Sequence, residues 1–204
     1  MTRLYAAAGA LAIAALLGWT SFQILAKRPG DVFAQCRSGA VAGGQIGGPF
    51  TLMDGGGQTV TAADVLAKPA LVYFGYASCT DVCPLDNARN AQAAELLANS
   101  GYDVTPVFIT LDPARDTPVV LADYTKNISE KLLGLTGTPQ QIRAVAAAFQ
   151  VYYQVPDNPG TEYAVDHTVL TYLMLPKTGY AAAFPREVTA QDLADRTGCF
   201  LKAS

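Results

Sequence analysis

The chain has 204 residues, of which 50% are hydrophobic and 15% are charged, with a formal net charge of −3. This length fits one globular domain with an additional anchoring segment, and a domain of about 150 residues buries enough surface to fold without covalent cross-links. Acidic residues outnumber basic ones by 17 to 14, and no Lys/Arg cluster occurs. The charge pattern therefore argues against nucleic acid or an anionic lipid surface as the partner.

Residues 4–26 form an apolar run without a charged side chain, ended by Lys27-Arg28-Pro29-Gly30. A helix of this length, at about 1.5 Å per residue, spans the roughly 30 Å hydrocarbon core of a bilayer. The run exceeds the usual signal-peptide core of about 7–15 residues, and no clear cleavage site follows. We therefore predict a transmembrane anchor at residues 4–26 after a short cytoplasmic N-terminus, residues 1–3. A cleaved signal peptide is the main alternative, and a buried helix of a soluble protein a lesser one.

Residues 27–49 are predicted to be a tether, because residues 39–49 are too rich in glycine to hold a regular element. The globular domain is expected at residues 50–204. It should begin with a hairpin of residues 50–53 and 58–61 around a glycine turn, followed by a short helix at 62–66.

Strands and helices are expected to alternate after this hairpin. The predicted strands are residues 70–76, 104–111, 132–135, 169–175 and 180–184. The first is a continuous apolar run, typical of a strand buried on both faces, and the second is also expected to be buried. The predicted helices are residues 85–99, 117–125, 138–150 and 189–198. Thr-Pro pairs open two of them, with Thr as the cap and Pro in the first turn. This order predicts an α/β fold with a mixed central sheet covered on both faces.

Two cysteines, Cys79 and Cys83, stand between the first buried strand and the next helix. The positive end of a helix dipole lowers the pKa of a thiol placed there, so thiolate is available near neutral pH. Thiolate is both the nucleophile of disulfide exchange and a ligand for soft metals. Pro84 and the strand–loop–helix setting argue against two ordinary core cysteines. The pair is therefore a candidate metal site or redox pair.

His167 is the only histidine, and it stands just before the strand predicted at 169–175. A lone histidine is more often structural or exposed, but Asp166 beside it could orient the ring, as outer carboxylates or carbonyls do for metal-bound imidazoles. Two thiolates and one imidazole form a soft set that suits Cu(I), and Cu(II) with one weak extra ligand. Structural zinc would need a fourth strong ligand, and none is evident nearby.

These residues occur within a larger set of motifs that resembles the Sco/SenC family of copper chaperones for cytochrome c oxidase. The motifs are the N-terminal anchor, Tyr73-Phe74-Gly75-Tyr76 with Ser78-Cys79-x-Asp81-Val82-Cys83-Pro84, Leu111-Asp112-Pro113-x-Arg115-Asp116-Thr117-Pro118, and Asp166-His167-Thr168. The resemblance implies a thioredoxin-like fold with an inserted β-hairpin, and copper, as Cu(I) or Cu(II), bound by Cys79, Cys83 and His167. Thr80 departs from the pattern, since many relatives have proline there.

The resemblance also implies that the loop of residues 112–118 lies beside the copper site. By themselves these residues favour a structural role, because Asp116 and Thr117 can cap the next helix and Arg115 could pair with a carboxylate. Asp81 is a candidate to bind backbone donors or to tune the sulfurs. Asp81, Asp166 and Arg115 are therefore the residues expected around the metal ligands.

Cys36 and Cys199 complete the set of cysteines. In an oxidising compartment an even number of cysteines favours pairing, and joining these two leaves the motif pair free. We predict a structural disulfide between Cys36 and Cys199, with two free thiols as the alternative.

The favoured function is delivery of copper to the dinuclear copper centre of a cytochrome c oxidase subunit. The protein would be held in the inner membrane by its anchor, with its domain in the periplasm or an equivalent space. Another periplasmic copper carrier or a thiol reductase is a further expected partner. The alternative is a thiol–disulfide oxidoreductase that keeps the target's cysteines reduced, and a thiol peroxidase is a third class. His167 distinguishes the first two, because disulfide exchange does not require it.

Overall fold

The structure, a computed structural model, describes residue 19 and residues 32–36, 46–157 and 160–204. The chain divides into two units, residues 1–35 and 36–204, and the fold below is that of the second unit. The predicted N-terminus and membrane anchor, residues 1–3 and 4–26, lie outside the described residues apart from position 19. Within the described part of the chain, no helix is both long enough and apolar enough to cross a membrane.

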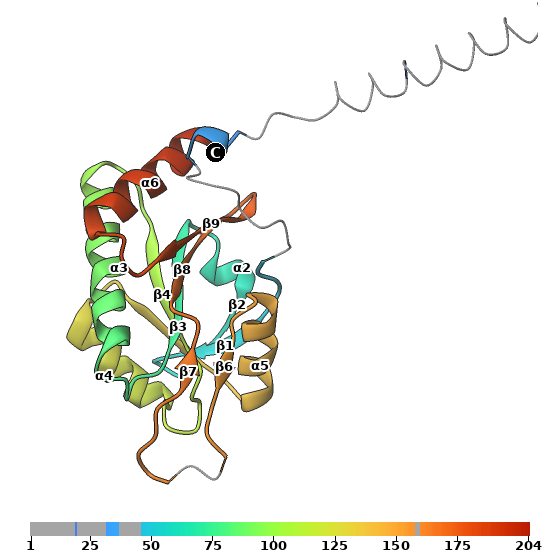
Figure 1. Ribbon diagram of the computed structural model, residues 1–204, viewed down its shortest axis with the longest axis vertical. Helices are drawn as coiled ribbons and strands as arrows, with labels where there is room; N and C mark the ends of the chain where they lie inside the picture. Colours follow the sequence, from blue (N-terminus) through green and yellow to red (C-terminus); the bar gives the residue numbers. More distant parts are fainter. Residues whose placement is uncertain (1–18, 20–31, 37–45, 158–159) are drawn as a thin grey trace, which may run out of the picture. The chain divides into compact units, whose positions relative to one another are not determined.

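A seven-stranded mixed sheet lies at the centre of the domain, in the order β2-β1-β5-β4-β3-β8-β9 (Figure 1). β3, β4 and β5 are parallel, and the outer strands pair antiparallel with their neighbours. The strands are β1 (Thr51–Asp54), β2 (Thr59–Thr61), β3 (Ala70–Gly75), β4 (Thr105–Thr110), β5 (Leu133–Thr136), β8 (Leu170–Leu175) and β9 (Gly179–Pro185). Gly75 and Thr110 are paired, so β3 and β4 end at the same edge of the sheet.

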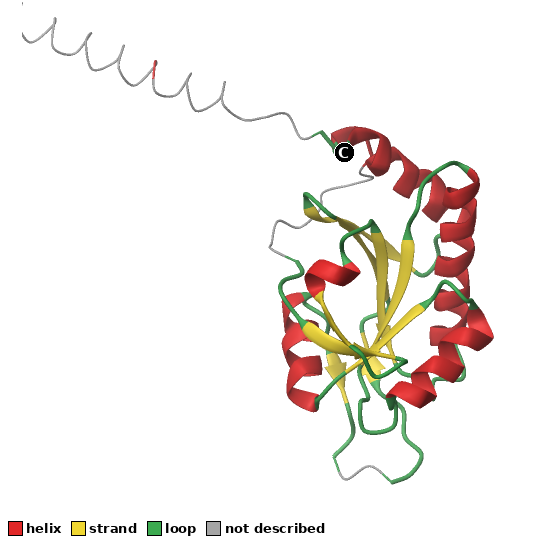
Figure 2. Ribbon diagram, turned by 180° about the vertical axis from the view of Figure 1, so that it is seen from behind, coloured by secondary structure: helices red, strands yellow, loops and turns green. Residues whose placement is uncertain are grey.

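Helices cover both faces of this sheet (Figures 1 and 2). One face carries α3 (Val82–Asn99), α4 (Pro118–Ile128) and α6 (Ala190–Ala203), and the other carries α2 (Ala62–Val65) and α5 (Pro139–Ala148). All six residues of β3 are buried, as its continuous apolar sequence requires of a strand covered on both faces. The predicted α/β fold with a mixed, doubly covered sheet is confirmed.

Three helices differ from the prediction by three residues or more at one end, and one of them is α4, which continues to Ile128 instead of ending at residue 125. α3 begins at Val82, three residues early, so Cys83 lies in its first turn. α6 continues past Gly198 to Ala203. Gly198 lies against α3, where an added Cβ would be 3.8 Å from a Leu97 methyl group, so this glycine packs between helices instead of ending one.

Two short elements were not predicted from the local pattern. β6 (Tyr153–Gln154) and β7 (Asp166–His167) form a separate two-stranded antiparallel sheet between α5 and β8. The family resemblance implies an inserted β-hairpin, and this antiparallel pair is the candidate for it. The 3-10 helix η1 (Ala34–Cys36) lies within the predicted tether, and the N–H of Gly47 donates to the carbonyl of Ala148, which joins the end of that tether to the domain.

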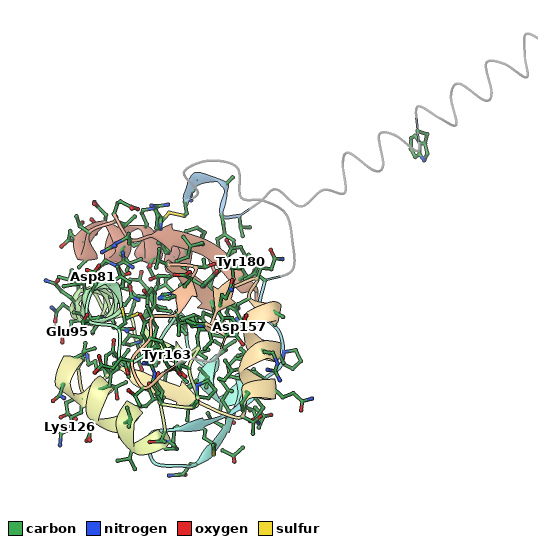
Figure 3. The ribbon with its side chains drawn as sticks, turned by 60° about the horizontal axis from the view of Figure 1, so that its bottom comes forward. Asp81, Glu95, Lys126, Asp157, Tyr163 and Tyr180 are labelled. Atoms are coloured by element: carbon green, nitrogen blue, oxygen red, sulfur yellow. A yellow bond between two sulfur atoms is a disulfide. The ribbon has the colours of Figure 1, made fainter. Side chains whose placement is uncertain are left out.

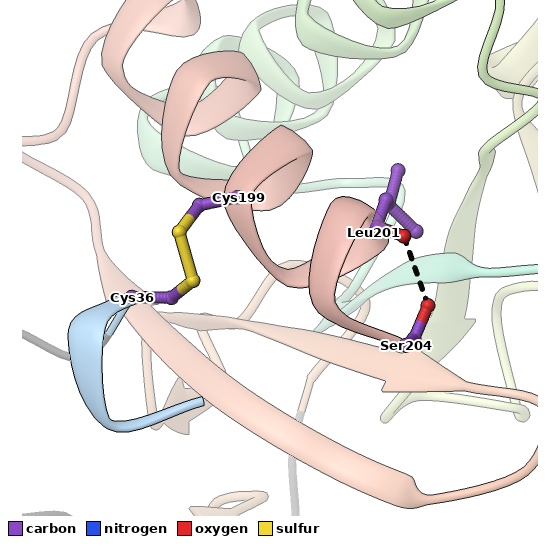
Figure 4. Close-up of a disulfide and its surroundings, with 4 residues drawn as sticks. All are labelled: Cys36, Cys199, Leu201 and Ser204. Atoms are coloured by element: carbon purple, nitrogen blue, oxygen red, sulfur yellow. Dashed lines mark hydrogen bonds between the residues drawn. A yellow bond between two sulfur atoms is a disulfide. The ribbon is translucent and has the colours of Figure 1, made fainter. Parts of the chain in front are cut away.

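Cys36 and Cys199 form a disulfide in the structure, as the sequence predicted, with their Cα atoms 5.7 Å apart (Figure 4). The bond joins the segment that precedes the domain to α6, whose C-cap residue, Ser204, donates from its hydroxyl to the carbonyl of Leu201. Cys79 and Cys83 remain free thiols. The fold therefore separates a structural pair of cysteines from a reduced pair.

Replacing Cys36 and Cys199 together by serine should lower the free energy of unfolding. The bond closes a loop with a sequence separation of 163 residues; the chain-entropy model assigns such a loop roughly 5 kcal/mol, an upper value because native strain and residual denatured-state structure reduce it. Urea unfolding in a Cys79→Ser, Cys83→Ser background, where no other thiol can exchange, measures the difference. An unchanged midpoint, or alkylation of Cys36 in unreduced protein, would contradict the disulfide.

Candidate metal centre

Cys79 lies on the loop of residues 76–81, called the cysteine loop below. This loop follows β3 at the edge of the sheet where β4 also ends, and it leads into α3. The N–H of Cys79 donates to the carbonyl of Tyr76 and closes a turn directly after β3. Cys83 follows in the first turn of α3, and its N–H donates to Cys79 Sγ at 3.4 Å. Both side chains are largely out of solvent, with 8% of Cys79 and 0% of Cys83 exposed.

The two thiols have different acidities because their surroundings differ. Burial acts to raise the pKa of Cys79, but hydrogen bonds from the backbone and thiol of Cys83 and from the backbone of Asp81 and Val82 lower it below the ordinary value. Burial raises the pKa of Cys83 far above the ordinary value. Cys79 is therefore the more acidic and more nucleophilic thiol, and Cys83 is the buried partner.

His167, in β7, lies beside the cysteines although it is distant from them in the sequence. Its Nε2 atom is 3.6 Å from Cys83 Sγ, although the two residues are 84 positions apart. The ring edge that carries Nδ1 faces the carbonyl of Thr168 at 3.0 Å. A proton on Nδ1 can donate to that carbonyl, which leaves the Nε2 lone pair directed at Cys83.

Asp166 and Asp81 do not take the roles that the sequence suggested for their carboxylates. Asp166 is exposed, and the group that faces the second ring nitrogen of His167 is the Thr168 carbonyl. Asp81 is the N-cap residue of α3, but its side chain makes no capping hydrogen bond. The backbone of Asp81, instead of its carboxylate, forms a hydrogen bond that lowers the pKa of Cys79.

Asp116 is a site residue whose role the sequence assigned wrongly. It was expected to cap the following helix, but Thr117 alone does so, by accepting from the N–H of Val120. The Asp116 carboxylate is fully buried and accepts from the N–H of Ala77 at 2.9 Å and from the hydroxyl of Thr110 at 2.6 Å. It therefore holds the start of the cysteine loop against the end of β4.

Two tyrosines enclose the imidazole. Tyr73 and Tyr76 both lie edge-on to His167, with ring centroids 6.2 Å and 6.0 Å away and interplanar angles of 85° and 88°. Burial raises the pKa of both phenols above the ordinary value, so both are neutral at physiological pH. The sequence placed them in the Tyr-Phe-Gly-Tyr motif but gave them no role, because nothing local to β3 indicates a contact with residue 167.

Gly75 leaves the space that the Cys83 sulfur occupies. A Cβ atom at this position would lie 2.8 Å from Cys83 Sγ, 3.1 Å from Phe108 and 3.2 Å from the Tyr73 ring. Real Cβ atoms essentially never come within 3.0 Å of another atom, so the contact with the sulfur could not be kept, and the two ring contacts would be tight. A larger residue at position 75 must therefore displace the sulfur or one of the two rings.

The donors are near one another but do not yet enclose an ion. Within residues 32–36, 46–157 and 160–204, no three His, Cys, Asp or Glu side chains surround one point closely enough to hold a metal. Cys83 and His167 already face each other across 3.6 Å. Binding through all three donors therefore requires them to close in on the ion.

Comparison with known proteins shows the family to which the chain belongs. The SCO1/SenC family model matches residues 39–202, which include the cysteine loop, the 112–118 loop and His167. The chain belongs to the SCO1/SenC family. Protein SenC of Rhodobacter capsulatus is 50% identical to this SCO1/SenC chain over 201 residues, covering 97% of the chain and 90% of that protein.

Solved structures agree with the family and with its thioredoxin-like fold. Arabidopsis thaliana ScoI with copper bound is 36% identical, with a TM-score of 0.72, over 77% of this chain and 99% of that one. Yeast Sco1 with copper bound is 34% identical, with a TM-score of 0.75, over 79% of this chain and 91% of that one. The family predicted from the motifs is confirmed.

Alkylation should reveal the unequal thiols. Thiolate is the form that reacts with the alkylating reagent, and the pKa of Cys79 is lowered. The alkylation rate of Cys79 should therefore rise with pH around a midpoint below the ordinary thiol pKa of about 8.5. Cys83 should react more slowly at every pH. Iodoacetamide labelling of the Cys83→Ser and Cys79→Ser variants, followed by mass spectrometry, measures each thiol alone; equal rates would contradict the assignment.

Replacing Gly75 by alanine should destabilise the site. Overpacking of this kind usually costs about 1–3 kcal/mol, and here the nearest atom is a candidate ligand. Gly160→Ala is a matched control, because an added Cβ meets nothing within 4 Å there. Urea unfolding should show a lower free energy of unfolding for Gly75→Ala than for Gly160→Ala, and the alkylation rate of Cys83 should also differ between them. Equal values for the two variants in both measurements would show that the residues around position 75 can accommodate the added methyl group.

Proposed function

We propose that this protein binds copper through Cys79, Cys83 and His167 and delivers it to the dinuclear copper centre of a cytochrome c oxidase subunit. The observation that carries the proposal is the 3.6 Å separation of Cys83 Sγ and His167 Nε2. For a similar ion, zinc, bonds to thiolate and imidazole are about 2.3 Å and 2.0 Å long, and they span this distance when the angle at the ion is roughly 110°. Both atoms can therefore bind one ion without moving apart.

The donor set favours copper over other metals. Two thiolates select soft ions, and imidazole is a borderline donor that both copper oxidation states accept. The two relatives compared above, ScoI and Sco1, were solved with copper bound. Three donors also leave room for a fourth from an acceptor protein, so copper could pass by exchange of one ligand at a time.

Copper loading by this site should depend on both pH and redox state. Both thiols must lose their protons to bind a metal, so affinity falls as pH falls. Cys83, whose pKa is raised by burial, is the ligand for which protons compete most strongly. A disulfide between Cys79 and Cys83 would remove both thiolates, so only the reduced protein should load.

The unequal thiols also support a second candidate, a thiol–disulfide oxidoreductase. A lowered pKa at Cys79 favours attack on a partner disulfide, and Cys83 lies beside it to resolve the mixed disulfide. Such a protein would keep the oxidase subunit's copper-ligand cysteines reduced. Copper delivery remains the better proposal because disulfide exchange gives no role to His167.

We also propose that the domain works outside the cytoplasm, held to the inner membrane by residues 4–26. The apolar length of this segment supports an anchor, and the Cys36–Cys199 bond suits an oxidising space such as the periplasm. The expected partners are the copper-bearing oxidase subunit and either a second copper carrier or a thiol reductase that resets the pair.

Substitution of His167 by alanine should separate the two copper oxidation states. Cu(I) accepts two ligands and should stay bound to the thiolates, whereas Cu(II) affinity should fall by at least about tenfold, in line with the loss of one strong donor. Cu(II) loading should give a sulfur-to-copper charge-transfer band in the wild type, which is lost in Cys79→Ser and Cys83→Ser. Competition titrations and absorption spectra of reduced protein measure both effects.

Asp157→Asn is the control for this experiment, because Asp157 is exposed on the segment between β6 and β7 (Figure 3). If His167→Ala binds Cu(II) with unchanged spectrum and affinity and still exchanges disulfides normally, the copper proposal fails. The oxidoreductase would then replace it.

The full chain should stay in the membrane fraction after washing with alkaline carbonate, because a spanning helix is held by its apolar surface. Residues 30–204 alone should be soluble and folded, since the glycine-rich segment separates the apolar run from the domain. Release of the protein into the carbonate wash would favour a cleaved signal peptide.

A further inference from the structure

Three side chains from two loops form a closed cluster beside the metal centre. The Arg115 guanidinium lies over the Tyr163 ring, with its Cζ atom 3.5 Å from the ring centroid. Arg115 Nε donates to one carboxylate oxygen of Asp112 at 2.5 Å, and the Tyr163 hydroxyl donates to the other at 2.9 Å. We call Arg115, Asp112 and Tyr163 the clamp; Figure 3 brings this end of the domain forward, with Tyr163 labelled.

The ion pair between Arg115 and Asp112 is largely shielded from water, which strengthens it. The side chain of Asp112 is 2% exposed and that of Arg115 is 21% exposed. Arg115 Nη2 is buried and has no hydrogen-bond partner among the described residues. Leaving a buried donor unpaired costs free energy. The contacts of Arg115 with the Tyr163 ring and the Asp112 carboxylate must offset this cost, and they are the contacts that fix its position.

The segment that carries His167 needs such an attachment. β6 and β7 pair at only two positions, Tyr153 with His167 and Gln154 with Asp166, and a two-stranded pair of this size is not stable by itself. Tyr163 lies four residues before His167, close enough for its position to limit where the imidazole can go. Arg115 also lies 5.7 Å from the Tyr76 ring, which packs edge-on against that imidazole.

We propose that Tyr163 is a positioning residue of the metal centre: fixed by Arg115 and Asp112, it holds residues 163–167 so that Nε2 of His167 faces Cys83. The inference rests on the proposed function, in which His167 is a copper ligand. It assigns the 112–116 loop a task that helix capping does not explain. Residues that orient a ligand in this way commonly change metal affinity by about 10–100-fold when they are replaced.

The clamp should matter for Cu(II) and not for Cu(I). Cu(II) needs the imidazole, whereas Cu(I) can be held by the two thiolates alone. Loss of the clamp should therefore weaken Cu(II) binding by about 10-fold or more while Cu(I) affinity changes by less than about threefold. A general loss of structure would weaken both, because the cysteine loop would be affected as well.

The test compares Tyr163→Ala, Tyr163→Phe and Arg115→Lys in the full-length, reduced protein in detergent. Cu(I) and Cu(II) affinities are measured by competition, and pulsed electron paramagnetic resonance detects the imidazole nitrogen on Cu(II). Tyr163→Ala and Arg115→Lys should lose Cu(II) affinity and the nitrogen signal. Tyr163→Phe keeps a ring over the guanidinium and should retain most of both.

Tyr152→Ala is the matched control, because the Tyr152 ring is 60% exposed and its hydroxyl bonds only to Gln154 among the described residues. It should bind both ions as the wild type does. His167→Ala serves as the reference for complete loss of the imidazole. If Tyr163→Ala does not fold, Arg115→Lys, which keeps the charge but not the planar group, decides the question with the same two affinities.

The outcomes separate the clamp from the function on which it rests. If His167→Ala loses Cu(II) while Tyr163→Ala and Arg115→Lys keep it, the clamp is overturned and copper binding stands. If His167→Ala also keeps Cu(II), both proposals fall together. Equal loss of Cu(I) and Cu(II), or a similar loss in Tyr152→Ala, would show a general structural effect and would overturn the positioning role.

Discussion

The site depends on one buried carboxylate. Asp116 accepts from the N–H of Ala77 at the start of the cysteine loop and from the hydroxyl of Thr110 at the end of β4, while its own carbonyl accepts from Thr136 in β5. Burial raises its pKa, while the bonds from Thr110 and Ala77 act to lower it. Both bonds go to Oδ2, and Oδ1 is buried without a hydrogen-bond partner among the described residues. With the loop start fixed to two parallel strands, Cys79 and the first turn of α3 follow in defined positions.

Two adjacent turns after this anchored loop start place two thiols whose pKa values are shifted in opposite directions. Cys79 Sγ faces backbone N–H groups at the start of α3, which lower its pKa, whereas Cys83 lies in the space left by Gly75, where burial raises its pKa. Both proposed functions, copper binding and disulfide exchange, would use this difference between the two thiols. What distinguishes the two functions is the imidazole of His167, which lies against Cys83 and is held by a different part of the chain.

The sheet and its covering helices could be predicted because they follow from local patterns. A continuous apolar run indicated β3, and Thr-Pro pairs indicated the starts of α4 and α5. The β6–β7 pair could not be predicted in this way, since two residues per strand carry no period. At the site, chemistry and motif indicated Cys79, Cys83 and His167. The contacts of Asp116 with Ala77 and of Tyr163 with Asp112 join residues 39 and 51 positions apart, so no local pattern shows them.

The central claim is that one copper ion is bound by two sulfurs and one imidazole, which come from the loop after β3, the first turn of α3 and β7. X-ray absorption at the copper edge, on the reduced, Cu(II)-loaded protein, reports the identity and number of the ligand atoms directly. The account predicts two sulfur ligands together with outer-shell scattering typical of an imidazole, and it predicts that the imidazole scattering disappears in His167→Ala. A spectrum with two sulfurs and no imidazole in the wild type, or with only nitrogen and oxygen ligands, would contradict it.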